Sequence, residues 1–255
     1  MSEDVDFVRE AILACDRCEL RGQATQPVPF SGPAPAKNGI AVVAEAPGKD
    51  EDEQGVPLIG RAGQVLREDM LLVGINPENC TLLNTASCFP GELKTPNETH
   101  IKACQGNKLA QLDLAQPQWV LLLGKIALNG FRNDLQLGQA RGRPFQMEPD
   151  GPVFFTTYHP AAGLRKFDYR KVMRADLARF LEMVKDGNWY AFIGERCAVC
   201  ADWMYFVDRT GIPWCEEHLP IEGIVWKQQQ ESPPAATEAE GVQMLLDAFP
   251  GSEVQ

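Results

Sequence analysis

Three polar motifs each follow a short apolar run in this sequence. The first is residues 45–48, the second begins at Asn84, and the third is His159 with Pro160. Their carboxylate, amide and imidazole groups can donate or accept hydrogen bonds. In a parallel sheet the carboxyl ends of the strands lie along one edge, where sites form. One polar residue at a strand end is common, whereas three predict a site at that edge.

Two sets of cysteines are spaced as metal ligands. Cys15 and Cys18 form a C-x2-C pair, and Cys88 and Cys104 are further candidates. The second set combines another C-x2-C pair with two later ligands, and consists of Cys197, Cys200, Cys215 and His218. Three thiolates and one imidazole at this spacing predict a tetrahedral structural site for Zn²⁺. Cys80 opens an apolar run and is expected in the core.

Alternating strands and helices must position these residues. Apolar runs of strand length occupy residues 40–44, 81–84, 119–123 and 153–157. The sequence pattern indicates helices at residues 6–14, 61–73, 96–115 and 166–185. This order predicts a three-layer α/β/α fold with a central, mainly parallel four-stranded sheet.

The chain divides into three predicted parts. Residues 1–190 form the α/β domain, 191–226 a small zinc-finger-like module, and 227–255 a flexible tail rich in Gln, Glu, Pro and Ala. No apolar run approaches the roughly 18 residues needed to cross a membrane. The acidic N-terminus lacks the basic region of a signal peptide. We therefore expect a cytoplasmic protein, in which disulfides are disfavoured.

The charge is unevenly distributed. A net charge of −11 argues against general affinity for nucleic acid. Residues 132–174, however, hold eight basic and four acidic residues, a local net charge of +4. A basic face that contacts phosphates can therefore coexist with weak non-specific binding.

The order of the motifs resembles the family 4 uracil-DNA glycosylases, the iron–sulfur branch of the uracil-DNA glycosylase superfamily. The resemblance covers residues 12–185. Its pieces are residues 15–20, 45–48, 55–63, 84–88, Cys104, 123–124 and 158–160. It implies a hydrolase of base excision repair that cleaves the N-glycosidic bond of uracil, or of a related modified pyrimidine, in DNA and leaves an abasic site.

Two alternatives stay open beside this prediction. One is a glycosylase specific for another modified base, and the other is a catalytically silent DNA-binding module of the same fold. Leu58 and the acidic net charge favour the alternatives. Asn84 and His159 together favour catalysis.

The resemblance also implies a cofactor. Cys15, Cys18, Cys88 and Cys104 occupy the places of the family's ligands to a 4Fe–4S cluster. Their spacing alone leaves a structural zinc ion as the alternative. The cluster's expected role is scaffolding, because hydrolysis of an N-glycosidic bond needs no electron transfer.

The resemblance assigns roles to the strand-end residues. His159 hydrogen-bonds the anion that develops at O2 of the base, and Asn84 reads the polar edge of the flipped base with its amide. The pocket wall is formed by Glu45, Ala46, Pro47 and Gly48. The best-known branch of the superfamily has a water-orienting aspartate where this chain has Ala46. Water must therefore be held by the backbone or by Glu45.

Two further features concern the contact with DNA. The family has Phe, which stacks on the flipped base, where this chain has Leu58, and that change puts uracil in doubt as the base. By resemblance, the loop after Pro160 enters the minor groove, with Leu164 filling the gap in the stack. Arg165, together with Lys166, Arg170, Lys171 and Arg174, would contact phosphates.

The tail contains a possible partner-binding peptide. Gln243, Leu246 and Phe249 are spaced i, i+3 and i+6, as in peptides that dock on sliding clamps. The usual final aromatic residue is replaced by Pro250. The alternative is a short amphipathic helix that folds back on its own domain.

Overall fold

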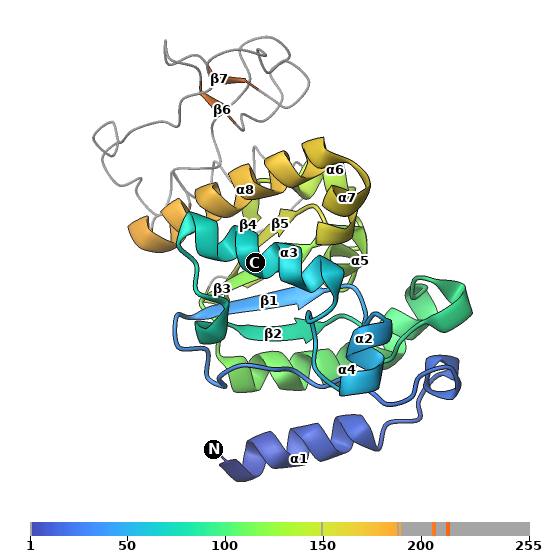
Figure 1. The fold of residues 1–255 in the computed structure, drawn as a ribbon. Coiled ribbons are helices and arrows are strands. Elements are labelled where there is room, and N and C mark those ends of the chain that lie inside the picture. Colours follow the sequence, from blue (N-terminus) through green and yellow to red (C-terminus); the bar gives the residue numbers. More distant parts are fainter. Residues whose placement is uncertain (1, 149, 188, 190–205, 208–212, 215–255) are drawn as a thin grey trace.

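A five-stranded sheet lies at the centre of the protein, whose computed structural model describes residues 2–148, 150–187, 189, 206–207 and 213–214 (Figure 1). The strands in chain order are β1 (Ile40–Ala44), β2 (Thr81–Asn84), β3 (Trp119–Leu123), β4 (Pro144–Phe145) and β5 (Val153–Thr157). Their order in the sheet is β2-β1-β3-β5-β4. The four predicted strands are parallel, and β4 adds an antiparallel edge.

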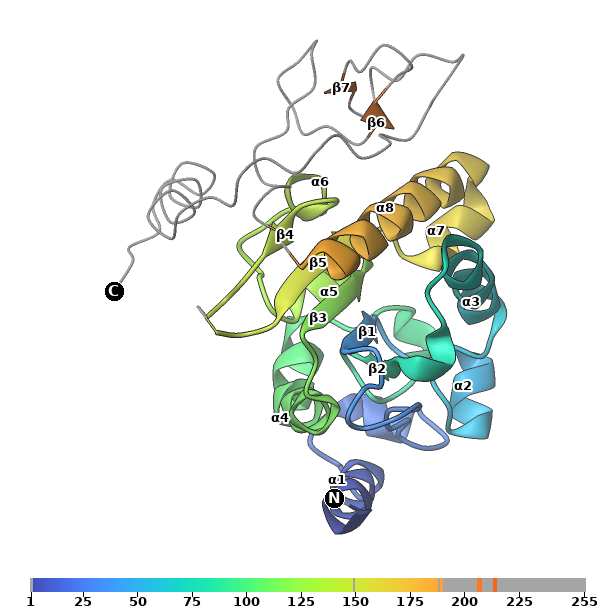
Figure 2. The same cartoon turned by 90° about the vertical axis from the view of Figure 1, so that its left-hand side faces the viewer.

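Helices cover both faces of the sheet (Figures 1 and 2). One face packs against α3 (Arg61–Val73) and α8 (Phe167–Asp186). The other face packs against α4 (Glu98–Ala115), α5 (Gly124–Asn129) and α6 (Leu137–Ala140). The predicted three-layer α/β/α architecture is therefore confirmed, with one strand more than expected.

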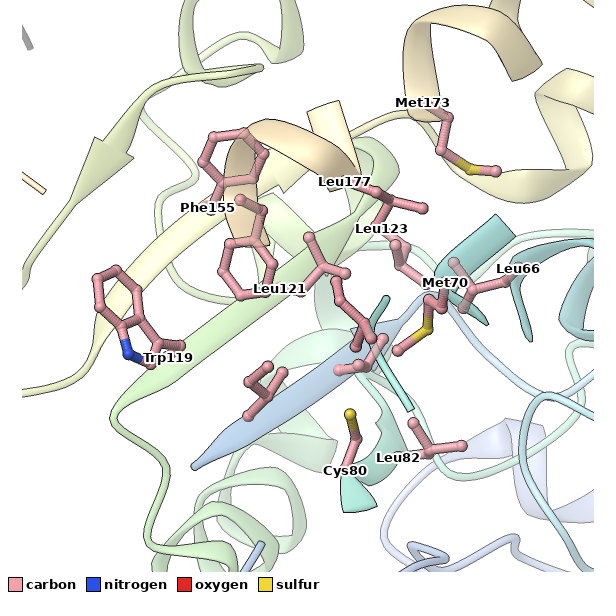
Figure 3. Packing of buried hydrophobic residues seen from close by; sticks show 14 of the residues in the cluster. Leu66, Met70, Cys80, Leu82, Trp119, Leu121, Leu123, Phe155, Met173 and Leu177 are labelled. Atoms are coloured by element: carbon pink, nitrogen blue, oxygen red, sulfur yellow. The ribbon is translucent and has the colours of Figure 1, made fainter. Parts of the chain in front are cut away.

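The larger core lies between the sheet and the α3/α8 layer. Leu121 and Phe155 point from the sheet toward Met70 of α3 and Leu177 of α8 (Figure 3). Cys80 is fully buried in this cluster, as its apolar setting predicted. Every residue of the four parallel strands is buried, because helices cover both sides. This burial explains why the strands are continuous apolar runs rather than alternating patterns.

The other helices are short or peripheral. α1 (Ser2–Leu13) lies beside α4, and the short helices are α2 (Lys49–Gln54) and α7 (Pro160–Arg165) (Figure 1). The 3₁₀ turns are η1 (Glu19–Gly22), η2 (Pro77–Asn79) and η3 (Gly91–Leu93). β6 (Phe206–Val207) and β7 (Pro213–Trp214) form a separate two-stranded sheet. Among the described helices, none is both long and apolar enough to cross a membrane.

One local prediction was wrong. Residues 161–165, expected as a loop, belong to the short helix α7, which begins at Pro160. Proline suits the first position of a helix because its missing N–H would have no partner there, and the Nδ1 atom of His159 caps the same end. A one-turn helix with Gly163 and two alanines has no strong sequence periodicity to reveal it.

Candidate active site and four-cysteine site

The ends of β1 and β2 hold Glu45 and Asn84 beside each other. Ala44, the last residue of β1, pairs with Asn84, the last residue of β2. Beyond this pair, the N–H of Thr85 donates to the carbonyl oxygen of Ala44 (2.9 Å). The N–H of Ala86 donates to the carbonyl oxygen of Glu45 (3.1 Å). The two chains therefore stay paired past the strands, and two predicted site residues lie at the same edge of the sheet.

Asn84 has a buried donor that nothing nearby uses. The residue is only 3% exposed, and its Nδ2 atom has no hydrogen-bond partner in the described part of the chain. An unpaired buried donor costs about 1–3 kcal/mol. Such a group is rare in native structures and calls for an explanation. Its place at a strand end makes it a donor available to an acceptor on a substrate.

His159 follows β5 and is held as a neutral imidazole. Burial, with a smaller effect from the charge of Arg165, lowers the pKa of His159 to about 4. The N–H of Ala161 donates to Nδ1 of His159 (3.2 Å). Because Nδ1 accepts, the proton of the neutral ring lies on Nε2. The histidine therefore offers one N–H donor and no net charge at neutral pH.

Gly124, at the end of β3, makes room for this histidine. Its φ is +83°, and a Cβ atom there would lie 2.9 Å from Cβ of His159. Only glycine meets both demands without strain. Residues 123–124 belong to the family pattern, but the sequence alone did not reveal this role of Gly124. A glycine after an apolar run is too common to reveal a close approach to a residue 35 positions later.

Glu45 and His159 share a charged neighbour. Burial raises the pKa of Glu45, against a hydrogen bond from Thr95 and the charge of Arg165, which lower it. Arg165 also acts on His159. The charge of Arg165 therefore acts on both Glu45 and His159. Thr95 was not predicted, because it lies in an irregular segment without a distinctive motif.

The loop that follows β1 is fixed by a carboxylate that sequence reasoning missed. Glu51 of α2 is 8% exposed and accepts hydrogen bonds from the N–H groups of Gly48 (3.0 Å), Ile59 (3.1 Å) and Gly60 (2.8 Å). It therefore ties residues 46–48 to the loop that contains Leu58. Glu51 stands in a run of acidic residues, 50–53, and no sequence pattern marks it as buried.

Leu58 is almost fully buried rather than exposed to solvent. It is 5% exposed and belongs to the larger core cluster. Its φ is +58°, a left-handed conformation that is rare for a leucine. A Cβ atom at Gly63 would lie 2.1 Å from the Leu58 carbonyl oxygen, so this loop and the start of α3 are closely packed.

The basic segment after His159 is only partly available to DNA. Arg170 contacts Asp69 of α3 at 2.9 Å, and Arg174 contacts the same carboxylate at 2.7 Å. Asp69 is fully buried, so both arginines join α8 to α3. The expectation that these two side chains also contact phosphates stays a prediction. Leu164, in contrast, is 43% exposed on α7.

The four N-terminal and central cysteines lie near one another. Cys18, Cys88 and Cys104 pack in a small cluster with Leu20. Burial, followed by the neighbouring thiols of Cys104, Cys18 and Cys15, raises the pKa of Cys88 to about 12. Four thiolates there would repel one another unless a cation neutralised them. Within the described residues, no group of three or more His, Cys, Asp or Glu side chains is arranged to hold a metal ion.

Arg17 adds a positive charge to this group. Its Nε donates to Sγ of Cys15 (3.4 Å), and its Nη2 donates to Oδ1 of Asn107 on α4. A Cβ atom at Gly106 would lie 3.3 Å from the same guanidinium, so the side chain rests against α4. The arginine therefore links the first cysteine pair to the helix that carries Cys104.

Two sets of predicted site residues lie outside the described residues. The first is the zinc set, Cys197, Cys200, Cys215 and His218. The second is the clamp-binding set, Gln243, Leu246 and Phe249. Both stay predictions.

Comparison with known proteins identifies relatives of the whole α/β domain. The pattern of the uracil DNA glycosylase superfamily matches residues 29–182. The type-4 uracil-DNA glycosylase of Pyrobaculum aerophilum is 34% identical over 184 residues, which are 69% of this chain and 93% of the relative. Those of Archaeoglobus fulgidus and Thermotoga maritima are 31% and 29% identical, over 70% and 72% of this chain and 92% and 96% of their own lengths.

The match includes the strands, their polar ends and the covering helices, so it extends over the same elements that hold Glu45, Asn84 and His159. This chain belongs to the uracil DNA glycosylase superfamily, in its type-4 branch.

Proposed function

We propose that this protein hydrolyses the N-glycosidic bond between uracil and deoxyribose in DNA, as the first step of base excision repair. Family membership supports the reaction class. The observation that carries the assignment to this site is the unpaired Nδ2 of Asn84, at the same edge of the sheet as the neutral His159. We also propose that the protein acts in the cytoplasm.

In this proposal the flipped base lies between Asn84 and His159, along the edge where the parallel strands end. β1 and β3 lie between β2, which ends at Asn84, and β5, which precedes His159. Three strand spacings amount to about 14 Å between the backbones. One edge of the base then faces Asn84 and the other faces His159.

His159 stabilises the leaving base in this proposal. When the glycosidic bond breaks, negative charge develops on the base and positive charge on the sugar. The Nε2–H of the neutral imidazole donates to the O2 oxygen, where the negative charge collects. A ring with a pKa of about 4 stays a neutral donor during the reaction and does not trap the base by giving up a proton.

Asn84 supplies recognition of the opposite edge. Its Nδ2 donates to the O4 oxygen of uracil, and its carbonyl oxygen can accept from N3–H. Binding of uracil would give the amide the hydrogen bond that it lacks within the protein. The cost of the unpaired donor is thereby recovered only when a matching base is bound.

Glu45 and the adjacent backbone position the water. Ala46 provides no carboxylate, whereas Glu45 has a pKa raised by burial, which brings it toward the range useful for accepting a proton. Ala46, Pro47 and Gly48 line the same side of the base. Glu51 holds this loop in place through its bond to Gly48.

The four-cysteine site fits an iron–sulfur cluster. We infer that Cys15, Cys18, Cys88 and Cys104 hold a 4Fe–4S cluster, which type-4 enzymes typically contain. Each cysteine of such a cluster binds a different iron atom, so the thiols need not converge on a single ion. When bound, the cluster supplies a crosslink between the N-terminal segment and α4. The predicted Zn²⁺ at Cys197, Cys200, Cys215 and His218 is a second, separate proposal.

The DNA contact completes the proposal. Leu164 is exposed on α7 and fills the gap that the extruded nucleotide leaves, while Arg165 faces the site from the same helix. The tail peptide with Gln243, Leu246 and Phe249 is proposed to dock on a sliding clamp. A related modified pyrimidine stays the second candidate substrate, because Leu58 replaces the family's stacking aromatic residue.

The test is incubation of the purified protein with oligonucleotides that carry one uracil, one 5-hydroxymethyluracil or only normal bases, followed by alkaline scission. We expect abasic sites with uracil, and a loss of at least about tenfold in His159→Ala and Asn84→Ala, the scale of a single catalytic donor. Abasic sites with the modified base alone would shift the substrate. No product from either base would support a silent DNA-binding module.

A further inference from the structure

Two large apolar side chains are exposed close together in sequence, at the junction of α7 and α8. Leu164 on α7 is 43% exposed, and Phe167, the first residue of α8, is 64% exposed. Lys166 lies between the two helices in an extended conformation. Exposed phenylalanine is unusual in this protein, since Phe7 on α1 is the other example among the described residues. Leu164 has a place in the proposed reaction, whereas Phe167 has none so far.

One cation lies against the Phe167 ring, and Lys171, which supplies it, also pairs with Asp168 at 3.8 Å. The Nζ atom of Lys171 lies 5.0 Å from the ring centroid, and Lys166 extends over the ring of Tyr169 at 5.9 Å. Arg165, two residues before Phe167, acts electrostatically on His159 and Glu45. The ring is therefore close along the chain to the proposed active site. An exposed apolar ring beside a lysine, two residues after Arg165, matches a partner that carries both phosphates and stacked rings.

We propose that Phe167 stacks on a nucleobase of duplex DNA beside the gap that Leu164 fills. Leu164 replaces the extruded nucleotide, and the Phe167 ring covers a neighbouring base that has lost its stacking partner. Arg165, Lys166 and Lys171 contact the phosphates around it. This inference rests on the proposed function, and it adds an aromatic contact in a chain where Leu58 occupies the place of the usual one.

The test measures binding of the full-length protein to a duplex that carries one non-hydrolysable uracil nucleotide, 2′-fluoro-arabinouridine. The variant Phe167→Ala should bind at least about fivefold more weakly than the parent, because stacking of an aromatic side chain on a base contributes about 1–3 kcal/mol. Phe167→Trp should bind as well as the parent. The matched control is Phe7→Ala, which removes an exposed ring of α1 and should leave binding unchanged, since α1 and α8 lie on opposite sides of the molecule (Figure 1).

Salt dependence separates stacking from charge. Phosphate contacts weaken steeply as salt rises, whereas stacking does not release counterions. The deficit of Phe167→Ala should therefore be similar at low and high salt, while Lys171→Ala should flatten the salt dependence. Equal binding by Phe167→Ala and Phe7→Ala, or a deficit that disappears at high salt, would overturn the inference.

The two proposals can fail separately. Release of uracil by the parent protein tests the reaction without reference to Phe167. The difference between the two alanine variants tests the stacking contact. A parent protein that releases uracil while both variants bind equally would remove only the role of Phe167.

Discussion

His159 is the residue whose protonation state matters most for the proposed reaction. Its pKa of about 4 implies that the neutral donor persists well below pH 6.5. We expect single-turnover uracil release to show no loss from His159 between pH 7 and about 5.5, and to fall as the pH approaches 4. The unfolded histidine takes up a proton near pH 6.5. The stability that neutral His159 contributes is therefore complete above that pH and is lost as the pH falls toward 4.

The measurement is a pH–rate profile together with an NMR titration of the ring nitrogens. Burial raises the pKa of Glu45, so the profile is repeated with Glu45→Gln to separate the two groups. A His159 ring that titrates near pH 6.5 in the folded protein would contradict the neutral-donor mechanism.

Asn84 should show opposite effects on stability and activity. Asn84→Ala removes a buried donor without a partner in the described structure, so the free energy of unfolding should stay the same or rise. Uracil release should fall at least about tenfold.

Asn76 is the control, since its side chain accepts from the N–H of Glu78 and caps η2. Asn76→Ala should lose about 1 kcal/mol of stability and keep full activity. Calorimetry and single-turnover cleavage would decide between these patterns.

Arg17 should affect retention of the cluster more than the fold. Its guanidinium donates to Cys15 and lies near Cys18 and Cys104, so in our proposal it neutralises part of the negative charge of the thiolates that hold the cluster. Arg17→Gln should lose iron to a chelator several times faster than the parent, as followed by iron content and visible absorbance, and Arg17→Lys should lie between them. Lys102→Gln removes an exposed positive charge near Cys104 and serves as the control. Equal iron loss in all three variants would show that the contact has no such role.

At the scale of elements, α2 holds the loops of the site through one carboxylate. Glu51 accepts three backbone hydrogen bonds, so Glu51→Ala leaves three N–H groups without that partner. Loss of hydrogen bonds to a charged group, at about 1.5–3 kcal/mol each, should lower the free energy of unfolding by about 3 kcal/mol or more. Glu53 lies on the same helix, and its side chain is 58% exposed in a surface pair with Lys49. Glu53→Ala should change stability by less than about 1 kcal/mol in denaturant titrations. Equal midpoints for both variants would rule out the fixing role.

The contrast between α2 and the strands explains what the sequence could predict. The four parallel strands are buried runs with a strong signal, and their boundaries were predicted within a residue. Glu51, Thr95 and Gly124 act through contacts with residues distant in sequence, which no local pattern records. The same holds for Asp69, whose pairing with Arg170 and Arg174 no local pattern predicted. Strand ends could thus be predicted, but the partners of charged side chains could not.

At the scale of the whole molecule, the acidic charge lies mostly outside the glycosylase domain. Residues 191–255 hold eleven acidic and three basic residues, so they carry −8 of the net charge of −11. The domain that binds DNA in our proposal has a net charge of only −3. Long-range repulsion from DNA is thus a property of the C-terminal part, while the basic segment around α7 and α8 acts locally. A protein that is acidic as a whole can therefore bind DNA through the domain with the smaller net charge.

Removal of residues 191–255 should therefore strengthen DNA binding without loss of the fold. Trp189 is the last described residue of the larger core cluster and is 4% exposed, so a chain ending at residue 190 keeps that contact. A chain ending at residue 187 lacks it and should be about 3–5 kcal/mol less stable, the cost of removing a buried tryptophan. The shorter of the two therefore serves as the control for fold integrity.

Binding of the 1–190 chain to uracil-containing duplex should exceed that of the full chain at low salt, and the difference should shrink as salt screens the charge. Weaker binding by the 1–190 chain at every salt concentration would instead assign DNA contacts to the C-terminal residues.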